Sequence, residues 1–232
     1  MFSLIFFLVF ASCTARVSGS LLADGRADLN VYAALEPRMT MLLGTLAAAS
    51  GVMQPGAPLL NGHSISASLS AAPGVASASL VNKTPSAIEG PVKISQINEF
   101  LAHGQAQGFI SFEQGSSSRD GKCAVNFSRD SAPQLLDLIS PEVSAYLAAL
   151  MAPIATGEVL TKAEYLALAG SVYGRGIADE ISQAVIRASV DFPGQVRSAR
   201  GGSFSGSRAE FTIPLLDLLV LETPLSYEVV WR

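Results

Sequence analysis

Residues 16–31 read RVSGSLLADGRADLNV and predict two β-strands joined by a tight turn. Asp24-Gly25 is typical of hairpin turns, because glycine readily adopts the positive φ that such turns require. After the turn Ala27, Leu29 and Val31 occupy alternate positions, so they would share one face of a strand. We therefore expect the chain to start its fold with a half-buried hairpin.

Further alternating segments predict more strands. Ser64 to Ala71 places Ile65, Ala67 and Leu69 opposite serines, and residues 75–82 alternate again after Pro73-Gly74, which favours a second antiparallel hairpin. We expect the remaining strands near residues 109–113, 122–128, 188–192, 196–200, 208–213 and 226–231.

Helical patterns separate these strands and dominate the middle of the chain. Glu36-Pro37 opens a helical stretch over Met39–Ser50, and Thr161 with Glu164 matches a capping box. The expected helices cover residues 39–50, 95–103, 131–153, 161–173, 177–189 and 214–221. The order of strands, helices and strands predicts an α+β fold, a largely antiparallel sheet with a helical middle region packed on it.

The composition limits what the chain can be. It has 232 residues, of which 49% are hydrophobic and only 15% charged, against about 25% charged residues in an average globular domain. This excludes a disordered, highly charged chain and favours one large core. The formal net charge is −4, whereas nucleic-acid binding usually needs a basic surface, so no nucleic-acid partner is expected.

The N-terminal segment indicates export. Residues 1–12 read MFSLIFFLVFAS and carry no charge. As a helix they would span about 18 Å, which is shorter than the ~30 Å hydrocarbon core of a bilayer. A short apolar run at the start of a chain is typical of a secretory signal peptide. We expect residues 1–12 to be that signal and residues 13–232 to form a single domain.

Residues Val9 to Cys13 read VFASC and resemble the lipobox of bacterial lipoproteins, with two small residues before the cysteine. Phe10 stands where that family usually has an aliphatic residue, and no Lys or Arg precedes the apolar run. The resemblance implies that signal peptidase II cuts before Cys13 and that Cys13 carries acyl chains such as palmitate. The alternative is a buried N-terminal strand or helix in which Cys13 is incidental.

The same resemblance implies a location and partners. Thr14 is not the aspartate that retains such lipoproteins at the inner membrane, so the outer membrane is favoured in a bacterium that has two membranes. Membrane lipid is the expected partner through acylated Cys13, together with an apolar ligand or an envelope protein. Because few residues separate Cys13 from the first expected strand, we also expect the domain to sit close against the bilayer.

The second cysteine is interpreted as structural. Cys123, Val125 and Phe127 alternate as on one face of a strand, and a buried cysteine acts as a small hydrophobe. His63 and His103 are the two histidines, and no closely spaced set of His, Cys, Asp and Glu suggests a zinc site. We expect no metal and no cofactor.

Two glycine-rich segments resemble catalytic motifs without their key residues. Gly115 to Cys123 differs from a phosphate-binding loop in spacing, has cysteine in place of Ser or Thr, and is expected to join two strands. Between Gly202 and Gly206 the central residue is Phe204, whereas a nucleophile elbow needs serine there. We therefore expect no enzymatic activity, with a hydrolase of dispersed catalytic residues kept as an alternative.

Two patterns indicate binding or close packing. Leu166, Gly170, Gly174 and Ala178 recur every four residues, which predicts either tight helix packing or, at the glycines, a helix break. The segments 131–153 and 214–221 are apolar on more than one side, which fits a buried core, a greasy cavity or a partner-facing patch. The sequence thus predicts an envelope lipoprotein with a structural or binding role, and alternatively a carrier of a lipid or other apolar ligand.

Overall fold

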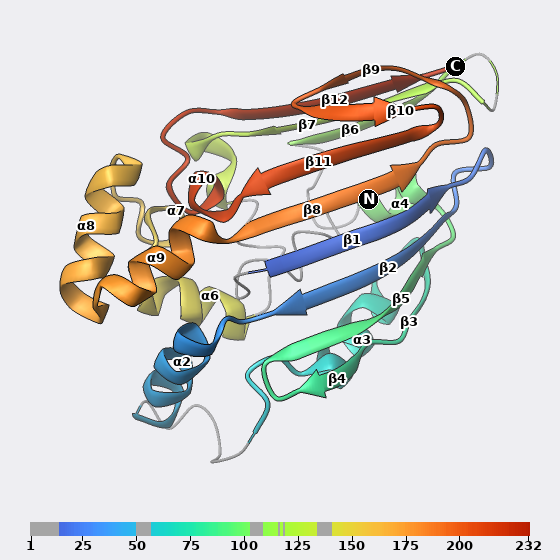
Figure 1. Cartoon of the computed structure of the whole chain (residues 1–232). Coiled ribbons are helices and arrows are strands. Elements are labelled where there is room, and N and C mark those ends of the chain that lie inside the picture. The colour runs from blue at the N-terminus through green and yellow to red at the C-terminus, as the bar shows by residue number, and fades with distance from the viewer. Residues whose placement is uncertain (1–13, 50–56, 103–108, 116, 118, 134–140) are drawn as a thin grey trace.

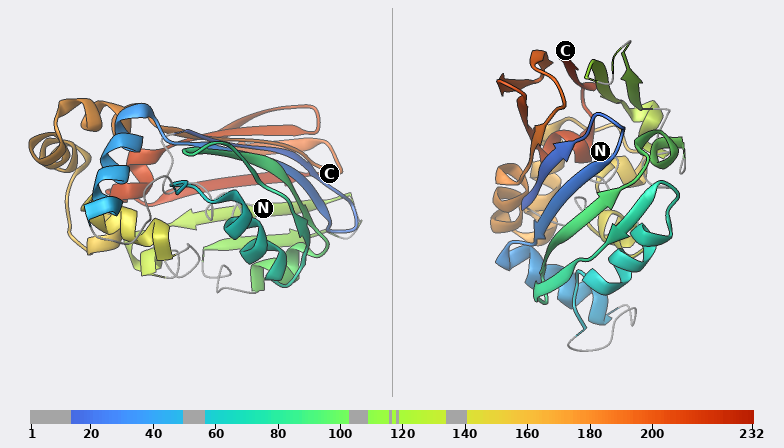
Figure 2. Two further views of the ribbon diagram at one scale, coloured as in Figure 1. Left: turned by 90° about the horizontal axis from the view of Figure 1, so that it is seen from below. Right: turned by 90° about the vertical axis from the view of Figure 1, so that its right-hand side faces the viewer.

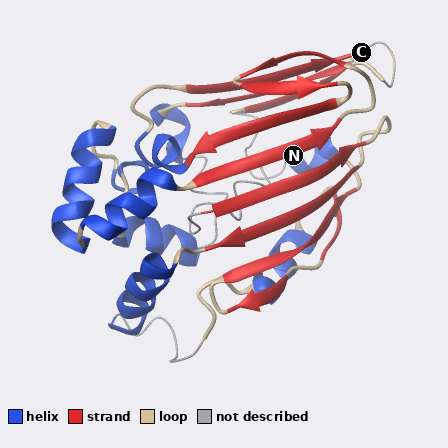
Figure 3. Cartoon of the chain, viewed as in Figure 1, coloured by secondary structure: helices blue, strands red, loops and turns tan. Residues whose placement is uncertain are grey.

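A computed structural model gives the fold of residues 14–49, 57–102, 109–115, 117, 119–133 and 141–232 (Figure 1). It is an α+β fold with two β-sheets and with helices gathered mainly at one end, as Figure 3 shows. The expected fold class is therefore confirmed. Within the described residues the strands pair antiparallel except for one parallel pair, β1 with β8.

The larger sheet, sheet A, has the strand order β10-β11-β8-β1-β2-β5-β3, with β4 also paired to β5. Its strands are β1 (Thr14–Leu21), β2 (Ala27–Ala34), β3 (Val75–Ala78), β4 (Val81–Thr84), β5 (Ala87–Ile94), β8 (Val185–Asp191), β10 (Gly202–Ser205) and β11 (Arg208–Pro214). The predicted first hairpin is confirmed: β1 and β2 pair from Thr14–Ala34 to Leu21–Ala27 around the Asp24-Gly25 turn. Sequence reasoning did not place β8 beside β1.

The smaller sheet, sheet B, has the order β6-β7-β12-β9. Its strands are β6 (Ile110–Gln114), β7 (Gly121–Phe127), β9 (Val196–Arg200) and β12 (Leu225–Trp231). Strand β9 belongs to sheet B and β10 to sheet A, and Gly201 alone separates them, with a φ of +77° that favours glycine. The turn at Gly201 thus carries the chain from sheet B to sheet A.

The core comes from alternate positions of both sheets. In β1 and β2 the inward residues Val17, Val31 and Ala33 are fully buried, whereas Arg16 and Asp28, on the opposite face, are exposed. In sheet B the core includes Phe127, Val229 and Trp231. The period-2 burial that the sequence predicts for residues 27–31 is therefore present in the fold.

The helices are α2 (Pro37–Ala49), α3 (Gly62–Ala71), α4 (Ile97–Ala102), α6 (Pro141–Ala149), α7 (Pro153–Thr156), α8 (Lys162–Tyr173), α9 (Arg175–Gln183) and α10 (Leu215–Val220), with a 3-10 turn at Arg129–Ser131. In Figures 1 and 2 the helices α2, α6, α8 and α9 lie beyond one end of sheet A. The predicted helices 161–173 and 214–221 are confirmed within one or two residues.

The strand predicted over Ser64–Ala71 is wrong, because these residues form α3. Asn61 caps the helix by accepting a hydrogen bond from the Ser64 N–H at 3.1 Å. Ser66 and Ser70, one turn apart, accept hydrogen bonds from the N–H groups of Leu80 and Ala78 at 2.7 and 3.0 Å. These serines attach the helix to the β3–β4 edge, a contact that alternation within the segment could not reveal.

Two predicted helices have wrong limits. Of the helix expected over 131–153, residues 134–140 lie outside the described residues; the rest is divided, with α6 from Pro141, α7 from Pro153, and a left-handed φ of 52° at Met151 between them. Proline is tolerated at a helix start but not inside one, so each proline begins a new helix. The helix expected over 177–189 ends at Gln183, because the next residues pair as strand β8 with β1.

Candidate functional site: the anchor end of sheet A

The candidate lipidation residue, Cys13, lies just outside the described residues, and its neighbour Thr14 begins strand β1. Thr14 pairs with Ala34 of β2 and with Val185 of β8, and the next residue, Ala15, is 1% exposed. The chain therefore enters the central strand of the larger sheet directly after Cys13. We call this end of sheet A, marked by Thr14, Ala34 and Val185, the anchor end.

Two carboxylates tie helix α2 to the anchor end. The Thr14 hydroxyl donates a hydrogen bond to Glu36 Oε1 at 3.2 Å, and α2 starts at the next residue, Pro37. Glu180 of α9 accepts hydrogen bonds from the backbone N–H groups of Arg38 at 3.2 Å and Met39 at 2.9 Å. A carboxylate at a helix N-terminus satisfies N–H groups that have no partner within the helix and interacts favourably with the helix dipole.

Glu180 is a residue whose role the sequence did not show. It lies 141 positions from Met39 in the chain, so no local pattern links the two residues. Its carboxylate fixes how α2 and α9 are placed against each other. Since both helices flank Thr14, Glu180 helps to shape the surface around the anchor end.

The stripe of small residues contains a helix break, one of the two possibilities that the sequence left open. Gly174 ends α8 and precedes α9, with a φ of +91° that a side chain would oppose. A Cβ atom added at Gly170 would lie 3.6 Å from the Cβ of Ala178, which is ordinary van der Waals contact. Gly174 therefore breaks the helix, while α8 packs against α9 at Gly170 with enough room for an alanine side chain.

Cys123 is a free, buried thiol on β7. Its side chain faces the core with Val125 and Phe127, and the residue is 4% exposed. Burial raises the pKa of the thiol to about 11, because the apolar surroundings disfavour the charged thiolate. The thiolate is the nucleophilic form, so Cys123 is unreactive at neutral pH and acts as a small core residue, as the sequence predicts.

A polar hollow of about 620 Å³ opens at the other end of sheet A, where the β10–β11 hairpin meets the end of β8. Its lining includes the hydroxyl residues Ser203, Ser205 and Ser207. Arg208 donates two hydrogen bonds to the Asp191 carboxylate, from Nε at 3.0 Å and Nη2 at 2.7 Å. This bidentate pair neutralises both charges within the hollow.

The remaining motif residues take structural positions. Residues 115–120 join the antiparallel strands β6 and β7, closed by a hydrogen bond from the Gly115 N–H to the Asp120 carbonyl at 2.8 Å, so this segment does not lead into a helix as a phosphate loop must. His63 is exposed on α3, and His103 lies outside the described residues. Within the described part of the chain no group of three or more His, Cys, Asp and Glu side chains gathers as a metal site.

Comparisons with known proteins add little. Neither protein-family models nor curated proteins match the chain. Among solved structures, the chain is similar to the folded domain of LppM from Mycobacterium tuberculosis, determined by NMR, with 12% sequence identity, a TM-score of 0.42 and coverage of 94% of this chain and 88% of that one. A TM-score below 0.5 is too low to establish a shared fold.

Proposed function

We propose that this protein is an exported lipoprotein, held at a membrane of the bacterial cell envelope by acyl chains on Cys13, where it has a structural or binding role. The observation that carries the proposal is the position of Thr14. The central strand β1 starts at Thr14, so removal of residues 1–12 and acylation of Cys13 would leave every described strand in place.

The known strength of acyl anchors supports the proposal: one acyl chain binds a bilayer marginally, while two or three hold a protein stably. Among the helices that the structure describes, none is long and apolar enough to cross a bilayer. Thr14 after the cysteine favours the outer membrane in a bacterium with two membranes, by analogy with lipoprotein sorting.

The intact mass of the protein extracted from membranes tests the proposal. We expect a mass that corresponds to cleavage before Cys13 plus two or three acyl chains. In a Cys13→Ala variant we expect these chains to be absent and the protein to leave the membrane fraction. A Cys123→Ala variant is the matched control, because Cys123 is the second cysteine of the chain and is buried in sheet B.

Other masses would decide against the proposal. An unmodified mass that retains Met1 would refute lipidation, and acyl chains that persist in the Cys13→Ala variant would assign them to another residue. A lipid that is released only on denaturation would favour the alternative role as a carrier of an apolar ligand.

A further inference from the structure

The position of Thr14 restricts how an acylated protein can meet the bilayer. Consecutive Cα atoms are about 3.8 Å apart, so the anchored residue would lie next to Thr14 and no flexible tether would separate the lipid from sheet A. Thr14 is bonded to Glu36, directly before α2, and pairs with Val185, just after α9. This inference rests on the proposed lipidation: with Cys13 acylated, the helices beside the anchor end are the elements closest to the membrane.

Helix α2 has an unusually apolar outer surface. Over its 13 residues Arg38 is the one charged side chain, and Met41, one turn later, is 66% exposed. Leu42 and Leu46 are only half-buried. A surface helix in water normally presents several charged and polar residues on its outer face, whereas α2 presents Arg38 as its one charged residue beside the exposed Met41.

The corner between α8 and α9 also combines an exposed aliphatic residue with an arginine, as Met41 and Arg38 do on α2. Val172 in the last turn of α8 is 53% exposed, and Arg175, three residues later, is exposed at the start of α9. Figure 1 shows α8 and α2 on either side of α9 at the same end of the molecule. Each side of α9 thus has one exposed aliphatic residue within three positions of an arginine.

Arg38 reaches the first turn of α9, where Arg175 also lies. A Cβ atom added at Gly176 would lie 2.0 Å from Arg38 Nη1, so the Arg38 guanidinium rests on the Gly176 backbone, next to Arg175. Neither guanidinium forms an ion pair within the described part of the chain. Of the acidic residues on α9, Glu180 is bonded to the backbone of α2, and Asp179 is exposed one turn after Arg175.

We propose that Arg38, Met41, Val172 and Arg175, here called the anchor-end patch, dock the protein onto the surface of an anionic lipid bilayer. Met41 and Val172 enter the interface between headgroups and acyl chains, and the two arginines bind lipid phosphates. Aliphatic side chains flanked by Arg are the combination that lies stably at such an interface. The docked face would hold the rest of sheet A in one orientation above the membrane.

The test uses the full, acylated protein in vesicles of phosphatidylethanolamine and phosphatidylglycerol. Nitroxide labels are placed at Met41→Cys and Val172→Cys, with Phe204→Cys as the matched control. Phe204 is 47% exposed, similar to Val172, but lies on β10 at the opposite end of sheet A. Acylated Cys13 and buried Cys123 do not compete for the label.

We expect an aqueous nickel chelate to reach the labels at positions 41 and 172 several-fold less than the label at position 204. Arg38→Ala combined with Arg175→Ala should restore access in these vesicles. Equal access at all three positions in protein whose mass shows the acyl chains would overturn the docking proposal alone. A mass without acyl chains would instead overturn the proposed function.

A change in lipid charge tests whether the two arginines contribute to docking by binding anionic lipid. In vesicles of phosphatidylcholine alone, where the bilayer is neutral, protection at positions 41 and 172 should fall toward the value of the double arginine variant. Unchanged protection there would show that the arginines do not bind anionic lipid.

Discussion

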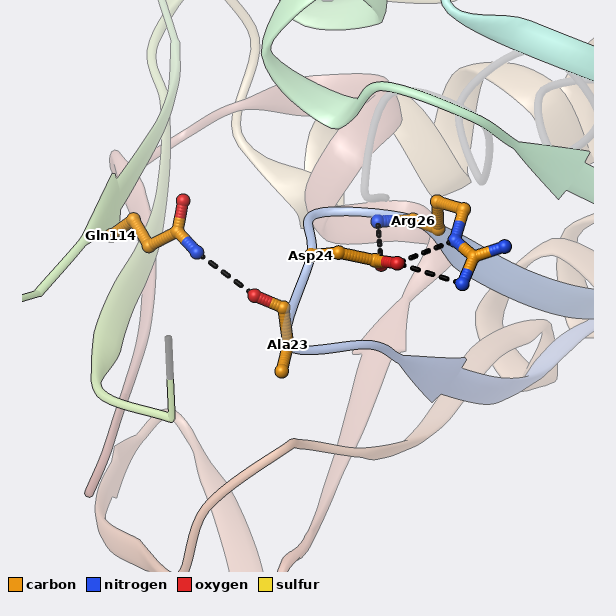
Figure 4. A network of polar contacts seen from close by, with 4 residues as sticks. All are labelled: Ala23, Asp24, Arg26 and Gln114. Atoms are coloured by element: carbon orange, nitrogen blue, oxygen red, sulfur yellow. Dashed lines mark hydrogen bonds and ion pairs between the residues drawn. The ribbon is translucent and has the colours of Figure 1, made fainter. Parts of the chain in front are cut away.

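The two ends of sheet A differ in whether their exposed side chains have partners within the chain. At the end opposite the anchor, the β1–β2 turn has one local and one distant partner: Asp24 forms an ion pair with Arg26 at 2.7 Å, and Gln114 of sheet B, 91 positions away, donates a hydrogen bond to the Ala23 carbonyl at 2.9 Å (Figure 4). At the anchor end the strands lead into helices, and Arg38 and Met41 face outward without such partners. The polar groups of the β1–β2 turn thus have partners within the chain, whereas at the anchor end Arg38 has no ion-pair partner among the described residues and Met41 is 66% exposed. We call the end that contains the β1–β2 turn the turn end.

The largest effect is expected from the core side of α2. Leu43 is fully buried, so Leu43→Ala should lower the free energy of unfolding by about 2–5 kcal/mol through lost burial and a residual cavity. Thr45→Ala, on the outer side of the same helix, should change it by less than about 0.5 kcal/mol. Urea unfolding in detergent, followed by the fluorescence of Trp231, measures both. Equal values would mean that α2 does not pack on the core.

The next prediction compares one substitution at the two ends. Gly25 in the β1–β2 turn has a φ of +83°, so Gly25→Ala should destabilise the fold by about 1–2 kcal/mol. Gly44 lies inside α2 with open space around its Cα, so Gly44→Ala should stabilise it by about 0.5–1 kcal/mol. The same unfolding measurement gives both values, and effects of the same sign would contradict the assigned backbone conformations.

The capping box of α8 should have a smaller effect. Thr161→Ala removes a side-chain acceptor for the Glu164 N–H and should cost about 1 kcal/mol. Hydrogen bonds that Glu164 accepts from the Thr161 N–H and hydroxyl, both at 2.8 Å, lower the pKa of the Glu164 carboxyl.

A carboxyl whose pKa is lowered in the folded state stabilises the fold above its unfolded pKa, and this contribution is lost as the pH falls through the folded pKa. We therefore expect the loss of stability on acidification below pH 4.5, the reference value of the carboxyl, to be weaker in the Thr161→Ala variant. Unfolding midpoints measured from neutral to acidic pH check this. An acid dependence identical to that of the unaltered protein would contradict the assignment.

The smallest effect is expected at the turn end. Asp191→Asn removes the charged acceptor of Arg208, in an ion pair whose side chains are 39% and 55% exposed. Exposed pairs contribute little and are screened by salt, so the loss should be detectable at low ionic strength and should vanish at high ionic strength. A loss that persists in high salt would show that the pair is shielded from solvent within the hollow.

Features that depend on neighbouring residues could be predicted. The Asp24-Gly25 hairpin, the Thr161–Glu164 capping box and the alternating face of Cys123, Val125 and Phe127 each act over a few positions, and the structure contains all three. The early start of the first strand also agrees with expectation, because β1 begins at Thr14.

Features that depend on distant partners could not be predicted. The serines of α3 accept hydrogen bonds from the N–H groups of Ala78 and Leu80 at the β3–β4 edge. Glu180 caps helix α2, which begins 143 residues earlier in the chain, at Pro37. The anchor-end patch has the same origin, because Arg38 reaches Gly176, the neighbour of Arg175, only when α2 and α9 pack together. No spacing in the sequence links residues so far apart.

The sequence by itself determined the α+β class, the hairpin that contains β1, and the lipobox-like segment that ends at Cys13. Periodicity and turn chemistry are local, so they can be recognised from a few consecutive residues. Only the tertiary structure decided that β1 lies in parallel beside β8, and that Arg38 of α2 reaches Gly176 at the start of α9. That arrangement forms because burying the inward faces of strands more than 150 residues apart in the chain lowers the free energy. A local sequence pattern contains no information about such distant contacts.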